Sequence, residues 1–125
     1  MSTLKVNTIQ NTSGGSSSTP EQIEQGRAKA WVNFNSVGSI SIRDSFNVSS
    51  VTESATGDYQ INFSTNMSNA NYCITSQGNY RDSDAAGRVF VVPRTQSTST
   101  FQIEIYGDGG GQLNSERVFA AVHGD

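Results

Sequence analysis

The feature that most constrains the fold of this chain is a period-two alternation of apolar and polar residues that begins at Ala30. Such a period places alternate side chains on opposite faces of a β-strand, whereas a helix requires a period near 3.6. The alternation is clearest in five runs, and we expect the apolar members of each run to face a common core. These inward residues are Val32 and Phe34; Ile40 and Ile42; Tyr59, Ile61 and Phe63; Phe101, Ile103 and Ile105; and Val118, Ala120 and Val122.

The same pattern predicts eight strands, over residues 31–35, 39–42, 46–51, 59–63, 71–76, 88–92, 101–106 and 117–122. Turn sequences separate these strands at intervals of about 8 to 15 residues, a spacing typical of sandwiches and barrels. We therefore predict an all-β domain over residues 30–125, an antiparallel β-sandwich of jelly-roll-like type with about eight strands.

Composition favours this fold over a helical one. Leucine occurs only at Leu4 and Leu113, and lysine only at Lys5 and Lys29, so the chain lacks the residues that normally build helix surfaces. The single cysteine, Cys73, excludes an internal disulfide. Because Cys73 stands in a strand-like run, we expect a small buried side chain and not a reactive thiol.

The first part of the chain has a different character. Residues 1–19 are predicted to form an extended N-terminal arm, with a short strand signal over residues 4–9 and a flexible linker over residues 11–18. A short helix is predicted within residues 20–29. It would begin at a capping box formed by Thr19 and Gln22.

Gly26 is well placed to end this helix, and Ile23 is its only large apolar residue. One such residue cannot bury a helix against its own domain. We therefore expect Ile23 to pack against something else, and identical copies arranged around an axis would serve.

Residues with catalytic or metal-binding chemistry are sparse. His123 is the only histidine, and it stands two residues from the end of the sequence, where a catalytic triad would not be held rigidly. One histidine and one cysteine cannot form a zinc site. The sequence therefore predicts no catalytic residue, no metal, no cofactor and no enzymatic activity.

Two partial motifs bear on this prediction, one for calcium binding and one for glycosidic cleavage. Asp82, Ser83 and Asp84, followed by Gly87, partly match a calcium loop, but Pro93 stands where the closing glutamate is needed. A solvated loop is the main interpretation, and a low-affinity calcium contact is the alternative. The acidic residues elsewhere are expected near turns or as lone outward side chains, so no pair for glycosidic cleavage can be named; they are Glu53, Asp58, Glu104, Asp108 and Glu116.

One segment, residues 80–88, has the composition of a recognition surface. Tyrosine and arginine give rigid contact area and directed hydrogen bonds, and an aromatic ring near carboxylates also suits sugars. The alternative is a structural loop, or a contact in which the arginines pair with the aspartates of a neighbouring subunit. The candidate receptor-binding residues are Tyr80, Arg81, Asp82, Asp84 and Arg88.

Charge and hydropathy exclude several partners. A net charge of −3 without a basic stripe argues against nucleic acid. The N-terminal residues contain no apolar core of the length that a signal peptide requires, and no stretch approaches a membrane span. We expect the protein to be made in a cytoplasm and not to insert into a membrane.

Four phrases resemble small tail-fibre and fibre-like virion proteins of tailed bacteriophages, among which marine and cyanobacterial phages are prominent. They are LKVNTIQ at residues 4–10, AKAWVNF at 28–34, IRDSFNVSS at 42–50 and GDYQINF at 57–63. The resemblance rests on the four phrases taken together.

The resemblance implies a homotrimer on a fibre axis in the virion, with residues 1–19 joining other tail or capsid proteins and the β domain exposed to the host surface. It implies binding of a host-surface polysaccharide without cleavage. The chain has no shaft repeat, so a fibre tip, a fibre adaptor and a capsid decoration remain open, the last two without a receptor.

Overall fold

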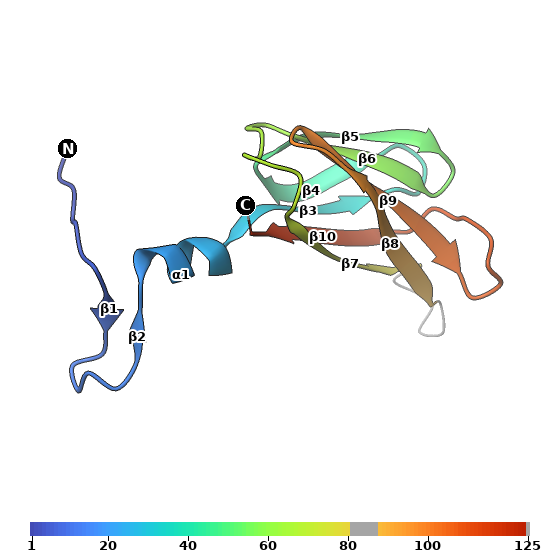
Figure 1. Ribbon diagram of the computed structural model, residues 1–125. Helices are drawn as coiled ribbons and strands as arrows, with labels where there is room; N and C mark the ends of the chain where they lie inside the picture. Colours follow the sequence, from blue (N-terminus) through green and yellow to red (C-terminus); the bar gives the residue numbers. More distant parts are fainter. Residues whose placement is uncertain (81–87, 125) are drawn as a thin grey trace.

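The computed structural model describes residues 1–80 and 88–124, and residues 28–124 form a two-layered antiparallel β-sandwich (Figure 1). This confirms the predicted fold class. The strands of one sheet are β3 (Ala28–Asn35), β4 (Ser41–Phe46), β7 (Cys73–Asn79) and β10 (Arg117–His123). The strands of the other sheet are β5 (Val48–Ala55), β6 (Asp58–Phe63), β8 (Val89–Gln96) and β9 (Thr100–Gly107).

The strand order is β4–β3–β10–β7 in the first sheet and β5–β6–β9–β8 in the second. Consecutive strands form hairpins within a sheet at β3–β4, β5–β6 and β8–β9, and the other connections between these strands pass from one sheet to the other. Of the inner strand pairs, β3–β10 joins the first and last strands of the domain, and β6–β9 joins strands that β7 and β8 separate in the sequence. Their pairing ties the domain together through contacts that are remote in the chain.

The core lies between the two sheets, where the alternating apolar residues of both inner faces meet. The predicted inward residues of β3, β6, β9 and β10 are all buried, and Met67 and Tyr72 join them from the connection between β6 and β7. Phe34 packs edge-on against Tyr59, with ring centroids 5.5 Å apart. Period two thus correctly identified the buried face of all four inner strands.

The corner between β4 and β5 is a single residue, Asn47, which has a left-handed backbone conformation with φ 54°. Its side-chain oxygen accepts a hydrogen bond from the amide of Thr65 at 2.7 Å. Its side-chain nitrogen donates to the carbonyls of Lys29 and Thr65 at 3.2 and 3.1 Å. Asparagine tolerates this conformation better than most residues, and here it also fastens both sheets to the corner.

Four predicted strand boundaries are wrong near this corner and a bulge in β4. The expected strands at 39–42 and 46–51 are in fact β4 and β5, which begin later and run on to Phe46 and Ala55. The register of β4 shifts opposite Asn33 and Phe34. As an edge strand β4 exposes most of its residues, including the predicted core residue Ile42, so its hydrophobic pattern did not mark its ends.

The N-terminal arm differs from its prediction. Residues 4–8 form no strand, and the expected flexible linker instead closes a small hairpin in which β1 (Ile9–Gln10) pairs with β2 (Ser17–Ser18). Asn11 organises its turn, since its side-chain oxygen accepts hydrogen bonds from the Ser13 hydroxyl at 3.0 Å and the Gly15 amide at 2.9 Å. This side-chain turn signal was overlooked within a Gly/Ser-rich stretch.

The helix α1 (Pro20–Gly26) confirms the predicted capping box. The Gln22 amide donates to the Thr19 hydroxyl at 3.2 Å, and the Thr19 amide donates to the Gln22 side chain at 2.9 Å. The helix ends at Gly26, as expected; Arg27 is extended, and β3 begins at Ala28. Figure 1 shows the arm and helix extending from the end of the sandwich where the C-terminus lies.

Candidate functional site

The predicted recognition loop is described only at its two ends. Arg81, Asp82 and Asp84 lie outside the described residues, as does the partial calcium motif. Tyr80 follows β7 and Arg88 precedes β8, and both line a shallow hollow of about 420 Å³. The other residues that line this hollow belong to the glycine-rich turn after β9, Gly107, Asp108, Gly109, Gly111, Gln112 and Leu113.

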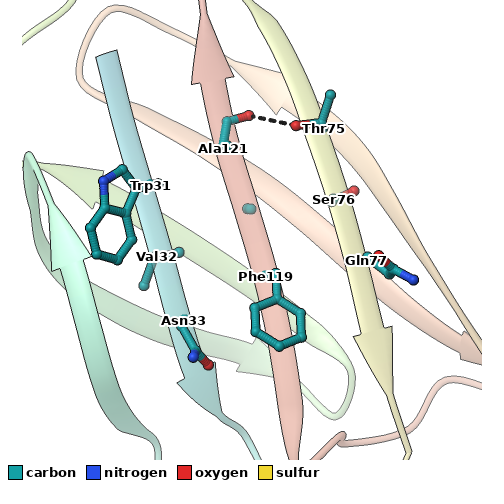
Figure 2. A pocket seen from close by; sticks show the side chains of 9 residues that line it. Trp31, Val32, Asn33, Thr75, Ser76, Gln77, Phe119 and Ala121 are labelled. Atoms are coloured by element: carbon teal, nitrogen blue, oxygen red, sulfur yellow. Dashed lines mark hydrogen bonds between the residues drawn. The ribbon is translucent and has the colours of Figure 1, made fainter. Parts of the chain in front are cut away.

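A second hollow lies on the outer face of the sheet β4–β3–β10–β7, and sequence reasoning did not identify it. It is an open groove of about 460 Å³. Figure 2 shows the residues that line it, which come from three neighbouring strands. They are Trp31, Val32 and Asn33 of β3, Phe119, Ala120 and Ala121 of β10, and Thr75, Ser76 and Gln77 of β7.

Strand register explains why the surface is hollow at this place. Ala121 of β10 stands opposite Trp31 on one side and Thr75 on the other. The small alanine side chain between two larger neighbours leaves a trough. In the next outward-facing row, Phe119 stands between Asn33 and Gln77 and bounds the trough along the strand direction.

The groove is the middle of a longer aromatic strip. Phe46 of β4 stands opposite Trp31 and is exposed, as is Phe119, with 38% of its surface accessible. Phe46, Trp31 and Phe119 thus follow one another across three adjacent strands. Phe46 and Phe119 are exposed and Trp31 is partly buried, so part of the apolar surface of this strip is available for contact with a ligand or partner.

Polar groups are interspersed with the aromatic rings. The Oδ1 atom of Asn33 is covered from solvent, yet it accepts no hydrogen bond from the described residues. Gln77 is exposed, and the Thr75 hydroxyl donates to the carbonyl of Ala121 at 3.4 Å. An unpaired buried acceptor of this kind costs free energy, which a hydrogen bond to a donor would recover.

The sequence contained a usable signal for this site. The alternation that placed Val32 and Phe34 in the core necessarily places Trp31 and Asn33 on the opposite, outer face. A tryptophan on the solvent face of a strand is unusual enough to mark a contact surface. The contributions of β10 and β7 could not be found in this way, because strand order decides which residues stand beside Trp31.

The outer face of the second sheet is different, because its polar side chains are partners of one another. Glu104 is only 6% exposed, accepts a hydrogen bond from the Tyr106 hydroxyl at 2.5 Å and forms an ion pair with Arg94. The bond from Tyr106, followed by that from Arg94, holds the pKa of the Glu104 carboxyl below its usual value, and the same bond raises the pKa of Tyr106. The prediction of a lone carboxylate at residue 104 is therefore wrong.

The described residues were predicted to hold no metal ion, and their side chains give no cluster of metal ligands. These residues contain no group of three or more histidine, cysteine, aspartate or glutamate side chains that could hold a metal ion. His123 is the last residue of β10 and stands opposite Cys73 of β7. The hydroxyl of Tyr59 donates to Asn114 Oδ1 at 2.6 Å, and burial is the main cause that raises the pKa of Tyr59.

The exposure of Cys73 differs from its prediction, whereas the exposure of Ile23 agrees with its prediction. Cys73 was expected to be buried, but it is exposed, because it is the outward-facing first residue of β7 while Tyr72 before it enters the core. Ile23, the candidate oligomer contact, is 42% exposed, and no residue of α1 is buried. The sandwich therefore leaves Ile23 uncovered, as expected.

Within the described residues, no helix has the length and apolar character to cross a membrane. Comparisons of the chain with protein-family models, curated proteins and solved structures found no match.

Proposed function

We propose that this chain is a structural and adhesive component of a bacteriophage virion, a trimeric tail fibre or fibre tip that binds a host-surface glycan without cleaving it. The observation that carries the proposal is the separation of the chain into a sandwich with its own core and an N-terminal arm and helix that are ordered but unburied. Such a division suits a domain that is displayed and a segment that attaches and assembles.

The first support is the apolar surface of the arm and helix. Leu4, Val6, Ile9 and Ile23 are all exposed. Full burial of one such side chain contributes roughly 1.5–3 kcal/mol, so contact with further copies or with another virion protein would stabilise the segment. The capping box orders α1 before any such contact, which reduces the conformational entropy lost on assembly.

The second support is the resemblance to fibre-like virion proteins. Its first phrase, residues 4–10, falls in the arm, and the other three fall on β3, on the corner around Asn47 and on β6. The shared phrases thus cover both the segment proposed to attach and the strands that build the displayed domain.

The described residues contain no group that could hold a metal ion, which is compatible with adhesion but does not by itself argue for it. The runner-up function is a purely architectural virion protein, a fibre adaptor or capsid decoration. Adsorption of particles to cells separates the two functions: the double variant Tyr80→Ala and Arg88→Ala tests the predicted loop, and the groove variants described below test the other surface.

The assembly is tested by measuring the mass of the full chain by light scattering behind a sizing column. We expect three 13.4-kDa chains per particle at micromolar concentration. Ile23→Glu should shift the mass toward one chain, because it places a charge in the proposed contact. Val37→Glu is the matched control, since Val37 is similarly exposed, at 40%, but lies in the turn between β3 and β4.

A monomer for the unaltered chain, with a stability that does not change on dilution, would contradict the trimer. Equal masses for the two glutamate variants would remove Ile23 from the contact. Localisation of the protein in an image of the intact particle would then decide its place on the virion.

A further inference from the structure

We propose that the groove between Trp31, Phe119 and Gln77 is a binding site for an uncharged oligosaccharide chain. This inference concerns a different surface from the predicted loop. It rests on the proposed function only for the source of the ligand, a cell-surface glycan, and the chemistry of the groove is argued independently of that source.

The aromatic strip supplies the apolar part of the site. A pyranose ring has one or two faces made of C–H groups and a rim of hydroxyl groups, so it buries an apolar face when it stacks on an aromatic ring. Trp31 lies beside the trough over Ala121, and Phe119 bounds the trough along β10 (Figure 2). Binding sites of small ligands typically combine such an apolar lining with a few well-placed polar groups.

The polar part of the site consists of uncharged donors and acceptors. Asn33 and Gln77 each offer an amide with donor and acceptor atoms, and both stand beside Phe119 in the same row. The unpaired Oδ1 of Asn33 needs a donor, and a hydroxyl group of a sugar seated over the groove can supply it once the amide turns. Hydroxyl groups both donate and accept, so they match this mixture.

The charge of the groove selects among glycans. None of the described residues that line it is charged, and the nearest carboxylate in the register is Asp44, which stands opposite Asn33. A polyanionic glycan would meet no basic residue in the lining and would be repelled by Asp44; the exposed Arg117 stands outside the lining, one outward-facing position beyond Phe119 on β10. The surface therefore matches a neutral chain in charge and disfavours a sulfated or uronic-acid-rich one.

The outer face of the other sheet does not offer an equivalent site. Its polar side chains bond to one another: Thr95 to Gln102, Gln60 to Asn62, and Asn62 to Ser50. A ligand there would have to break bonds that already exist. A second protein is a poorer occupant of the groove than a glycan, because a stable protein contact buries about 800 Å² per partner with an apolar centre, and here amides interrupt a narrow aromatic strip.

The chain supplies its own probe for the test, because Trp31 is the only tryptophan in the sequence. Tryptophan fluorescence therefore reports on this groove alone. The full-length protein is run on native gels that contain dextran, laminarin, galactomannan or arabinogalactan as neutral polysaccharides, and dextran sulfate as the anionic counterpart of dextran. Oligosaccharides of each retarding polymer are then titrated while the emission of Trp31 is followed.

We expect at least one neutral polysaccharide to retard the protein, and we expect dextran sulfate to retard it no more than dextran does. The emission of Trp31 should change on titration with the oligosaccharide and should reach saturation. Phe119→Ala should weaken this binding about tenfold or more, as loss of a central aromatic contact does. Phe90→Ala should leave it unchanged. Phe90 is the matched control because it is also an exposed aromatic residue of a strand, but lies in β8 of the other sheet. Equal melting temperatures would show that both variants are folded.

Several outcomes would overturn the inference. They are binding to none of the neutral polysaccharides, binding that leaves Trp31 emission unchanged, and binding that Phe119→Ala and Phe90→Ala weaken equally. If Trp31→Ala converted an oligomer into a monomer, the groove would be a contact between copies and not a glycan site.

The failure of this inference is distinguishable from the failure of the proposed function. If glycan binding were lost in Tyr80→Ala and Arg88→Ala but kept in Phe119→Ala, the protein would be an adhesin whose site is the loop. If the groove bound neutral glycans but the protein were absent from purified virions, the site would stand and the virion role would fall.

Discussion

The described residues of the arm and helix, 1–27, and of the sandwich, 28–80 and 88–124, obtain their order in different ways. In the arm and helix, the hydrogen bonds connect near neighbours, such as Asn11 with Gly15 and Thr19 with Gln22. In the sandwich, Ser36 and Ser115 exchange hydrogen bonds across 79 positions of the sequence, and a buried core separates the sheets. Local bonds fix the shape of a short segment, but only shared burial makes a domain unfold as one unit.

The comparison predicts that equivalent substitutions will have unequal effects in the two regions. Each change in the sandwich should lower its melting temperature, whereas the matched change in the arm should leave that temperature unaltered. The measurement throughout is thermal unfolding of the full-length protein followed by near-ultraviolet circular dichroism, which reports on packing of the core tyrosines.

The largest effect is expected for Ile103→Asp. Ile103 is fully buried in β9, and an unpaired charge there costs several kcal/mol out of a total stability of about 5–15 kcal/mol for a domain of this kind. The variant should fail to fold. Ile9→Asp introduces the same charge at an exposed position of β1 and should melt normally, so a normal melt for Ile103→Asp would contradict the assigned strand facing.

The next effect is expected for Gly57→Ala. Gly57 has φ +73°, and a Cβ atom there would lie 2.8–2.9 Å from backbone atoms of Ile105 and Leu113. Left-handed strain and this clash together should cost about 3 kcal/mol or more. Gly26→Ala is the matched change in α1, where an added Cβ meets nothing within 4 Å, and it should be neutral or slightly stabilising for the helix.

A moderate effect is expected for Asn47→Ala, at about 2 kcal/mol. The substitution removes the side-chain hydrogen bonds that join the corner to Lys29 and Thr65, and each bond contributes roughly 1 kcal/mol to stability, or somewhat less where it is exposed. The alanine variant also keeps the left-handed backbone conformation at this position. Asn47→Gly relieves the strain but not the lost bonds, so it should lie between Asn47→Ala and the unaltered protein. Asn11→Ala should loosen the β1–β2 hairpin without moving the melting temperature of the sandwich.

The smallest effect is a dependence on pH. The folded-state pKa of Glu104 is lowered, so the contribution of this carboxylate to stability is present above its unfolded pKa of about 4.3 and is lost as pH falls through the lower folded value. Glu104→Gln should therefore show a smaller loss of melting temperature between about pH 6 and pH 3 than the unaltered protein. Glu24→Gln in α1 should not change this loss, although Lys29 and Arg27 also lower the pKa of Glu24.

The candidate site was less predictable than the core. Ile23 was found because a local count of apolar residues in a capped helix shows that its partner is missing. The outward position of Trp31 could have been predicted from the alternation along β3, which places Val32 and Phe34 in the core. Phe119, Gln77 and Thr75 could not, because they stand near Trp31 only through the strand order β3–β10–β7. Boundaries failed at β4 and β5, where a bulge and a one-residue corner interrupt the period.

The sequence by itself determined the sandwich class, the inward residues of the inner strands and the capped helix, because each depends on the spacing of neighbouring residues along the chain. Only the tertiary structure decided the strand order, the burial of Glu104 beside Tyr106 and Arg94, and the groove on the outer sheet face. These features depend on which distant strands become neighbours, and that choice is made by the packing of the whole core and not by any local pattern.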